Sequence, residues 1–226
     1  HYIDQYYGFW QRLMPEPMLE QVFAPIWDDV KHVSTRDIFR DVFKNHQNEL
    51  NSAEDYINHS LYFEAKTFLH GLFVVEDKLS MAHSLETRVP FMDNDLVDFA
   101  MSCPVSLKLN NLSEVVRVNE NEVKEKRQIH FQKTSDGKQI LRDVMSRHIP
   151  SNITSAVKQG FSSPDASWFK GESIDFVKET LLNPENSIYQ KLDYVSIETL
   201  LHEHIEGQEN RRLLIWSLLN FSQLAN

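Results

Sequence analysis

The sequence predicts a mainly α-helical fold. Apolar residues recur at intervals of three and four in several long segments, which is the spacing that places them on one face of a helix. Only six glycines occur in 226 residues, and this scarcity disfavours an all-β fold built on glycine-dependent turns. Pro104 and Pro150 stand where periodic segments end. We therefore expect a single helical domain over residues 1–226.

The longest periodic segment begins at Ser52, and Asp55 three residues later completes the pattern of a capping box. A broad buried face is predicted for its apolar positions, which are Ile57, Leu61, Ala65, Phe68, Leu69, Leu72 and Val75. A short helix between Pro90 and Pro104 is expected to turn inward Leu96, Val97 and Ala100. Further helices are predicted over 37–43, 138–148, from Pro164 to Phe169, and over 173–182, 194–206 and 209–224. The last is strongly apolar and is expected to be a core element.

Residues 113–137 interrupt the helical pattern. Val116 and Val118 alternate with polar residues, and so do Ile129 and Phe131 on the far side of a charged run. This alternation has the period of a β-strand, and the segment closes on a Ser-Asp-Gly turn signal. The sequence therefore predicts a small β-hairpin inserted over 113–137.

Composition and charge exclude several classes of protein. The net charge is −10 at pH 7, whereas nucleic-acid and anionic-membrane binders need a basic surface. No run of about 18 apolar residues occurs, so no membrane-spanning helix is expected. The single cysteine, Cys103, lies in an apolar context that predicts a buried structural thiol, which suits the reducing cytoplasm where we expect the protein. The chain opens on His1 without a methionine or a signal peptide, which predicts that it begins inside a longer protein.

No metal site is predicted from the histidines. His202 and His204 are two residues apart on a predicted helix, so they point about 200° away from each other and cannot face one ion. The sequence contains no H-E-x-x-H motif, no cysteine pair and no glycine-rich phosphate loop. Candidate functional residues are therefore expected outside these motif classes.

Two stretches carry charged residues at helix ends. In residues 77–93, Glu86 and Arg88 flank the exit from the long helix, and Pro90 forces the chain into an extended turn. The residues alone allow a salt-bridged corner that pins two helices or a functional site. In residues 138–158, four basic residues accompany one acidic residue, and Lys158 stands two positions before Gly160. This window is either a solvated basic face or a place where a lysine meets phosphate charge.

Together these stretches resemble the asparagine synthase family. The family pattern D-R-x-S-M-A-x-x-x-E-x-R-x-P-F-x-D is matched by Asp77, Ser80, Met81, Ala82, Glu86, Arg88, Pro90, Phe91 and Asp93. The later pattern, K-x-x-L-R followed by P and K-x-G-F-x-x-P, is matched by Lys138, Leu141, Arg142, Pro150, Lys158, Gly160, Phe161 and Pro164. Two long motifs in the same order make the resemblance specific from about Leu69 to Phe169.

The resemblance implies the helical C-terminal part of a synthetase domain of the adenine-nucleotide alpha-hydrolase-like (PP-loop) class. Such an enzyme uses ATP and Mg2+ to adenylate a carboxylate, typically that of aspartate. Ammonia from a glutaminase domain then forms the amide. The family's S-G-G-x-D-S loop is absent from this sequence, so the N-terminal half is the expected partner, small molecules are the substrates, and no nucleotide is expected to bind this chain alone. A homodimer is also open, because a separated helical segment exposes apolar surface.

The resemblance also implies roles for particular residues. Lys158 is expected to be the catalytic cation that contacts pyrophosphate or the acyl-adenylate. Glu86 is expected to orient Arg88 in the wall of the pocket. Close approach of the lysine segment to the nucleotide would be allowed by Gly160 and Phe161. Supporting positions behind the pocket wall would be Asp77, Ser80 and Asp93.

Departures from the family pattern leave alternatives open. Lys78 and Val75 stand where other members carry arginine and lysine, and residues 111–137 are longer than the usual link. The chain could therefore be a helical scaffold that keeps the ancestry without the catalysis. It could also belong to a variant that amidates a sugar acid or closes a β-lactam ring. The amide acceptor, the nitrogen donor and the oligomeric state are not determined by the sequence.

Overall fold

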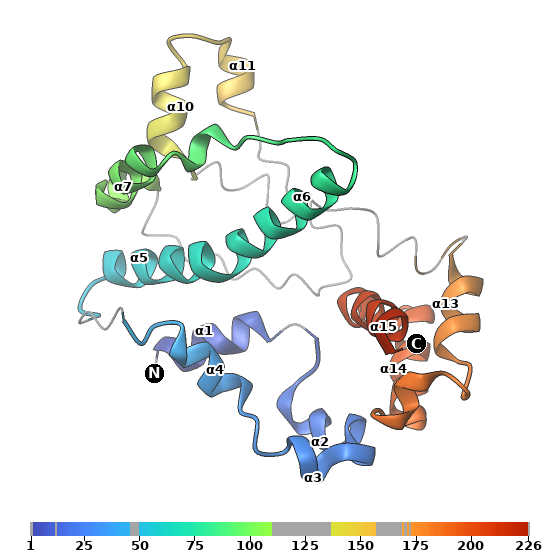
Figure 1. Cartoon of the computed structure of the whole chain (residues 1–226). Helices are drawn as coiled ribbons and strands as arrows, with labels where there is room; N and C mark the ends of the chain where they lie inside the picture. The colour runs from blue at the N-terminus through green and yellow to red at the C-terminus, as the bar shows by residue number, and fades with distance from the viewer. Residues whose placement is uncertain are drawn as a thin grey trace. The chain divides into compact units, whose positions relative to one another are not determined.

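The computed structural model describes residues 2–11, 13–45, 50–109, 137–156, 169, 171 and 173–225, and these residues are helical without any strand (Figure 1). The helices in chain order are α1 Tyr2–Trp10, η1 Glu16–Met18, α2 Leu19–Val22, η2 Ala24–Ile26, α3 Trp27–Val30, α4 Thr35–Asp41, α5 Ala53–Glu64, η3 Ala65–Leu69, α6 His70–Ala82, η4 Pro90–Met92, α7 Asn94–Ser102, α8 Val105–Lys108, α10 Gln139–Met145, α11 Ser151–Thr154, α13 Ile174–Leu181, η5 Ser187–Gln190, α14 Tyr194–Ile205 and α15 Arg212–Ala225. The predicted mainly α-helical fold is confirmed. The predicted hairpin over 113–137 and the helix expected at Pro164 fall almost wholly outside the described residues.

The chain divides into two compact units, and the boundary falls inside α4. The first unit contains the chain up to Arg36 and the C-terminal helices α13 to α15, while the second contains α5 to α11. Two compact units can belong to one domain, so the single-domain prediction stays a prediction. Within the described parts of both units, no helix has the length and apolar character needed to cross a bilayer.

The core of the first unit lies among α13, α14 and α15, which lie together in Figure 1. The side chains that form it are Val22, Phe169, Val177, Leu181, Ile188, Leu192, Ile197, Leu200, Leu201, Leu214, Ile215 and Leu218. Three of these, Leu214, Ile215 and Leu218, come from the last helix, α15, whereas Trp216 on the same helix is exposed. The expectation that the last helix is a core element is confirmed.

Polar groups fix how these helices meet. The amide of Asn186 donates to the Thr180 carbonyl at 2.8 Å and to the Ser222 hydroxyl at 2.9 Å, so it ties α13 to α15. Asp193 caps α14 by accepting from the Ser196 amide at 2.8 Å, and its own amide donates to the carbonyl of Val22. These bonds satisfy groups at helix ends that would otherwise be buried without partners.

The second unit is built on one long helix, in which α5 and α6 are joined by the π-helical turn η3 (Figure 1). The capping box predicted at its start is confirmed, because the amides of Ser52 and Asp55 each bond the other residue's side chain. Hydrogen bonds from the Ser52 hydroxyl and nearby amides hold the pKa of the Asp55 carboxyl below its usual value. On the inner side of the helix, Phe63 packs against Phe39, with ring centroids 4.4 Å apart.

The buried face predicted for this long helix is wrong, because none of its seven apolar positions is buried, and Leu61 and Ala65 in its first half are exposed. Phe68, Leu72 and Val75 are exposed, Val75 to 57%. Leu96, expected to face inward on α7, is exposed as well. The periodicity is real, but these apolar side chains of α6 and α7 are exposed in the described part of the chain.

Burial in the first unit yields a matched test of stability on one helix. Leu214 is 3% exposed and Leu224 is 85% exposed, and both lie on α15. We expect Leu214→Ala to lower the free energy of unfolding by about 2–5 kcal/mol, because it removes buried methyl groups and leaves a cavity. Leu224→Ala makes the same chemical change in solvent and should cost less than about 0.5 kcal/mol. Urea unfolding of the two variants measures the difference, and equal losses would contradict the assigned core.

Candidate functional site

The first motif begins where α6 ends. The amide of Ser84 donates to the Met81 carbonyl at 3.0 Å, and the amide of Leu85 donates to the Ser80 carbonyl at 2.9 Å. Ser84 itself is left-handed, with a φ of 58°. This pair of bonds around a left-handed residue is a Schellman motif, which closes the helix and releases the chain in an extended conformation.

The extended segment after Ser84 brings Glu86 and Arg88 together. Residues two apart in extended backbone point to the same side, so the carboxylate and the guanidinium meet. A nitrogen of Arg88 lies 2.5 Å from a Glu86 oxygen, and a second nitrogen donates to the Thr87 carbonyl at 3.1 Å. Both side chains remain exposed, 74% for Arg88 and 70% for Glu86. The Arg88 guanidinium is therefore paired with Glu86 and still accessible to solvent.

The end of the corner is set by Pro90 and Asp93. Val89, just before the proline, has φ −118° and ψ 82°, outside the helical region as expected for that position. Asp93 then caps α7 by accepting a hydrogen bond from the Leu96 amide at 3.2 Å. Asp93 therefore fixes the start of α7, the helix that follows the corner.

Asp77 and Ser80 lie on the last turns of α6. The Ser80 side chain is buried, and its hydroxyl donates to the Asp77 carbonyl at 3.1 Å. The contact involves the main chain of Asp77, while its carboxylate lies on the exposed side. The structure therefore places Asp77, Ser80, Glu86, Arg88 and Asp93 along one helix end and the corner that follows it.

The second motif is organised by Arg142 on α10. Its side chain donates to the carbonyls of Gly137 at 3.1 Å and Ala156 at 3.2 Å, and also to the carbonyl of Thr154. Arg142 therefore joins the start of α10 to the end of α11. The sequence analysis named Arg142 as part of the K-x-x-L-R pattern but assigned it no role. Its place in that pattern was the one signal that pointed to it.

The three residues expected nearest the reacting groups, Lys158, Gly160 and Phe161, lie outside the described residues. Their roles therefore stay predictions.

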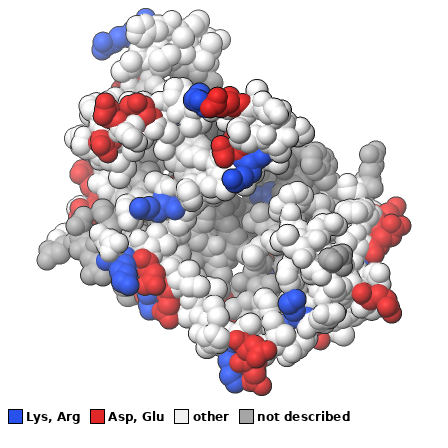
Figure 2. Space-filling model, in the orientation of Figure 1, with Lys and Arg blue, Asp and Glu red and all other residues white. Residues whose placement is uncertain are grey.

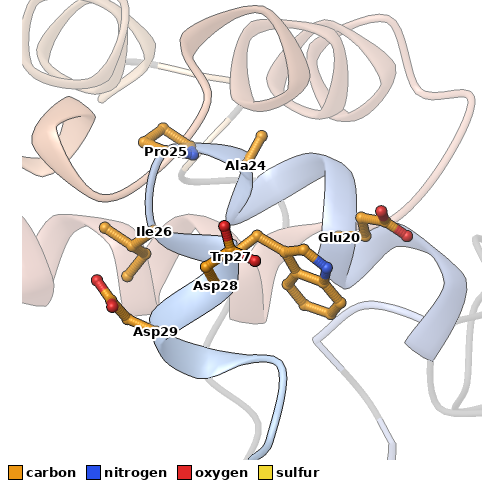
Figure 3. Close-up of a pocket in the computed structure, with 7 residues that line it drawn as sticks. All are labelled: Glu20, Ala24, Pro25, Ile26, Trp27, Asp28 and Asp29. Atoms are coloured by element: carbon orange, nitrogen blue, oxygen red, sulfur yellow. The ribbon is translucent and has the colours of Figure 1, made fainter.

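Two hollows occur elsewhere in the first unit. One, of about 340 Å³, lies on the stretch from α2 to α3, and its lining residues are Glu20, Ala24, Pro25, Ile26, Trp27, Asp28 and Asp29 (Figure 3). The other, of about 490 Å³, is lined on α14 and beyond by Glu198, Thr199, His202, Glu203, Glu206 and Gln208. Both linings carry three carboxylates, which repel a polyphosphate.

Charge is dispersed on the face of the molecule that Figure 2 shows. On the face shown in Figure 2, acidic and basic side chains are interspersed in small groups and separated by wide uncharged areas. No cluster of three or more potential metal ligands occurs within the described parts of the chain. His204 is fully buried whereas His202 is exposed, so the two histidines do point apart. His204 instead accepts a hydrogen bond from the Arg211 amide at 3.0 Å.

Comparison with known proteins identifies the class to which this corner and helical scaffold belong. Residues 2–226 match the family described as asparagine synthase. Among curated proteins, asparagine synthetase (glutamine-hydrolyzing) 1 of Bacillus subtilis (strain 168) is 28% identical over 193 residues, which are 85% of this chain and 26% of that protein. A protein of Mycobacterium tuberculosis (strain ATCC 25618 / H37Rv), named "Putative asparagine synthetase (glutamine-hydrolyzing)", is 25% identical over 157 residues, 69% of this chain and 20% of that protein.

The chain belongs to the asparagine synthase family, because the match covers nearly all of it. It spans about a quarter or less of the length of these curated relatives. No solved structure gives a significant match to the chain.

The left-handed exit from α6 generates a second test. A residue with a Cβ in this conformation costs about 1–2 kcal/mol, a cost that glycine does not carry. We therefore expect Ser84→Gly to raise the free energy of unfolding by about 1 kcal/mol, somewhat reduced by glycine's greater freedom in the unfolded chain. Ser146→Gly is the control, because Ser146 caps α10 at a φ of −60° and should lose stability instead. Chemical denaturation of both variants decides, and a loss in Ser84→Gly would contradict the assigned turn.

Proposed function

We propose that this chain is the C-terminal, helical part of an ATP-dependent synthetase that adenylates a carboxylate and converts it to an amide. The observation that carries the proposal is the family match over residues 2–226, with the charged residues of both motifs in place. Aspartate is the proposed acceptor and ammonia from glutamine the proposed donor, in line with the names of the matched relatives. The activity requires ATP and Mg2+, which we propose are bound mainly outside this chain, since the described hollows are acidic.

Lys158 is the proposed catalytic residue. Carboxylate adenylation gathers negative charge on phosphate oxygens, and amide formation gathers it on a tetrahedral oxyanion. A fixed ammonium lowers the energy of both states, and Gly160 two positions later allows the backbone to approach a ligand closely. Glu86 and Arg88 form the proposed pocket wall, and the ion pair between them supports the proposed role of Glu86 in orienting Arg88.

The proposed partner of the second unit is the remaining part of the longer protein. Large apolar side chains on α6 and beyond are exposed, including Leu79 and Phe91. Contiguous exposed apolar surface marks an interaction site in a folded protein. The matched relatives are several times longer than their overlap with this chain, which leaves ample sequence for an element that covers this face. Association of two copies through the same face is the competing arrangement.

A lysine substitution tests the catalytic proposal. In the longer protein that carries this chain, Lys158→Ala should reduce amide formation by about 100-fold or more while leaving glutamine hydrolysis within about twofold, because only the synthetase step develops charge at this residue. Lys178→Ala is the matched control, since Lys178 is exposed on α13. Steady-state assays of both reactions measure the split. Equal loss of both activities, or full activity in Lys158→Ala, would rule out the assigned role, and full activity would favour a scaffold.

The ion pair between Glu86 and Arg88 allows an independent test of the proposed pocket wall. Its contribution to the stability of the protein can be measured separately from its contribution to catalysis. An exposed pair of this kind contributes less than about 1 kcal/mol to folding. Arg88→Ala and Glu86→Gln should therefore unfold at nearly the wild-type urea concentration, yet raise the KM for the carboxylate substrate or lower kcat about tenfold or more if the pair lines the pocket. Arg40→Ala removes an exposed pair with Asp37 on α4 and serves as control. Wild-type kinetics in Arg88→Ala would leave the pair as a structural corner.

A further inference from the structure

We infer that His204 is a pH-sensitive latch, which fastens the connection between α14 and α15 only while its imidazole is neutral. The side chain is fully buried, and its Nδ1 atom accepts a hydrogen bond from the amide of Arg211 at 3.0 Å. An imidazole nitrogen accepts a hydrogen bond only when it carries no proton. The bond to Arg211 therefore requires the neutral ring with its proton on Nε2.

The connection between the two helices folds back onto the end of α14. Gly207 is left-handed, with a φ of 77°, and its amide donates to the His204 carbonyl at 3.1 Å. The amide of Gln208 donates to the Glu203 carbonyl at 2.9 Å, which completes a Schellman motif. Arg211 then returns to the same turn, where its guanidinium binds the Glu203 carboxylate at 2.7 Å. The bond to His204 and this ion pair both hold the segment before α15 to the end of α14.

The surroundings of the ring disfavour its protonated form in three ways. A proton on Nδ1 would point at the Arg211 N–H, so two donors would face each other and the hydrogen bond would be lost. This bond lies just before Arg212, where α15 begins, and a helix N-terminus carries partial positive charge that repels a cation. Complete burial removes the water that would otherwise stabilise a charged ring.

The charged side chains next to the imidazole also oppose its protonation. Arg211 and Arg212 bring two positive charges to the start of α15, and both side chains are partly buried. Glu203 precedes His204 in sequence, but its carboxylate accepts both hydrogen bonds from the Arg211 guanidinium, at 2.7 and 3.1 Å. Two arginines and one glutamate leave a net charge of +1 here, so an imidazolium would add a second positive charge.

Other ionisable groups on α2, α13, η5 and α14 are engaged elsewhere, neutral in acid or exposed. Glu198 accepts a hydrogen bond from the Tyr194 hydroxyl at 3.1 Å, and Asp193 caps the opposite end of α14. Burial raises the pKa of Tyr189 and of Tyr194 above the usual tyrosine value, so both stay neutral in acid. Among the described residues of these elements and of the connection before α15, the exposed groups are Glu20, Asp175, Lys178, Glu179, His202, Glu206 and Glu209.

The consequence is that the fold of the first unit loses stability in acid. A histidine in the unfolded chain takes up a proton at about pH 6.5, whereas the latched ring stays neutral. The folded chain therefore binds fewer protons than the unfolded chain, and its stability falls as the pH falls below about 6.5. Well above that value the ring is neutral in both states, so the latch contributes fully.

A first experiment reads the latch directly, by nitrogen-15 NMR of the histidine rings in the 226-residue chain. At pH 7.5, His204 should give the shifts of a neutral ring protonated on Nε2. At pH 5.5 it should still be neutral, whereas His202, which is exposed two residues away, should be charged. The variants His202→Asn and His204→Asn assign the two rings. A His204 ring that titrates with the midpoint of His202 in the folded protein would overturn the inference.

A second experiment measures the coupling to stability by urea unfolding at pH 7.5 and pH 5.5. Between these values the unfolding equilibrium constant of wild type should rise about tenfold more than that of His204→Asn, because only the wild type binds a proton at this position on unfolding. Asparagine keeps an acceptor oxygen for the Arg211 amide and does not titrate. His202→Asn is the matched control and should keep the wild-type pH dependence. Equal pH dependence in wild type and His204→Asn would overturn the latch, and if His204→Asn does not fold, the ring measurement on the wild type decides.

Discussion

The left-handed conformation of Ser84 is the constraint on which the described part of the candidate site depends. In this conformation the amides of Leu85 and Ser84 donate hydrogen bonds to the carbonyls of Ser80 and Met81, which ends α6 at a defined residue. The chain then leaves in an extended conformation, in which alternate side chains share a side, and the Glu86 carboxylate meets the Arg88 guanidinium as a result. The proximity of the two side chains therefore follows from local backbone rules.

Those local rules are also the part of the structure that the sequence predicts well. The capping box at Ser52, the extended residue before Pro90 and the opposite faces of His202 and His204 depend on neighbours a few positions away. The same holds for the boundaries of the helices that were predicted and are described, which differ from expectation by only a few residues, whereas α1, α2, α3, α8 and α11 were not predicted. The family motifs identified the candidate residues around Glu86. The spacing of these residues alone allowed either a salt-bridged corner or a functional site.

The remaining features depend on partners that spacing cannot identify. Periodicity correctly gave an apolar face on α6, but it could not say what covers that face, and Val75 proved exposed. Likewise, the Arg142 side chain bonds main-chain carbonyls 12 and 14 positions away. A carbonyl is present at every residue, so no pattern of side chains marks which ones an arginine will reach.

The bridge between Leu109 and Gly137 has a consequence for protein engineering. The two residues that enter and leave the stretch 110–136 are neighbours in space, so the helices on either side are joined without it. Lengthening a connection whose ends already meet costs only about 0.6 kcal/mol per doubling. A label or reporter inserted between Leu109 and Gly137 is therefore expected to disturb α8 and α10 little.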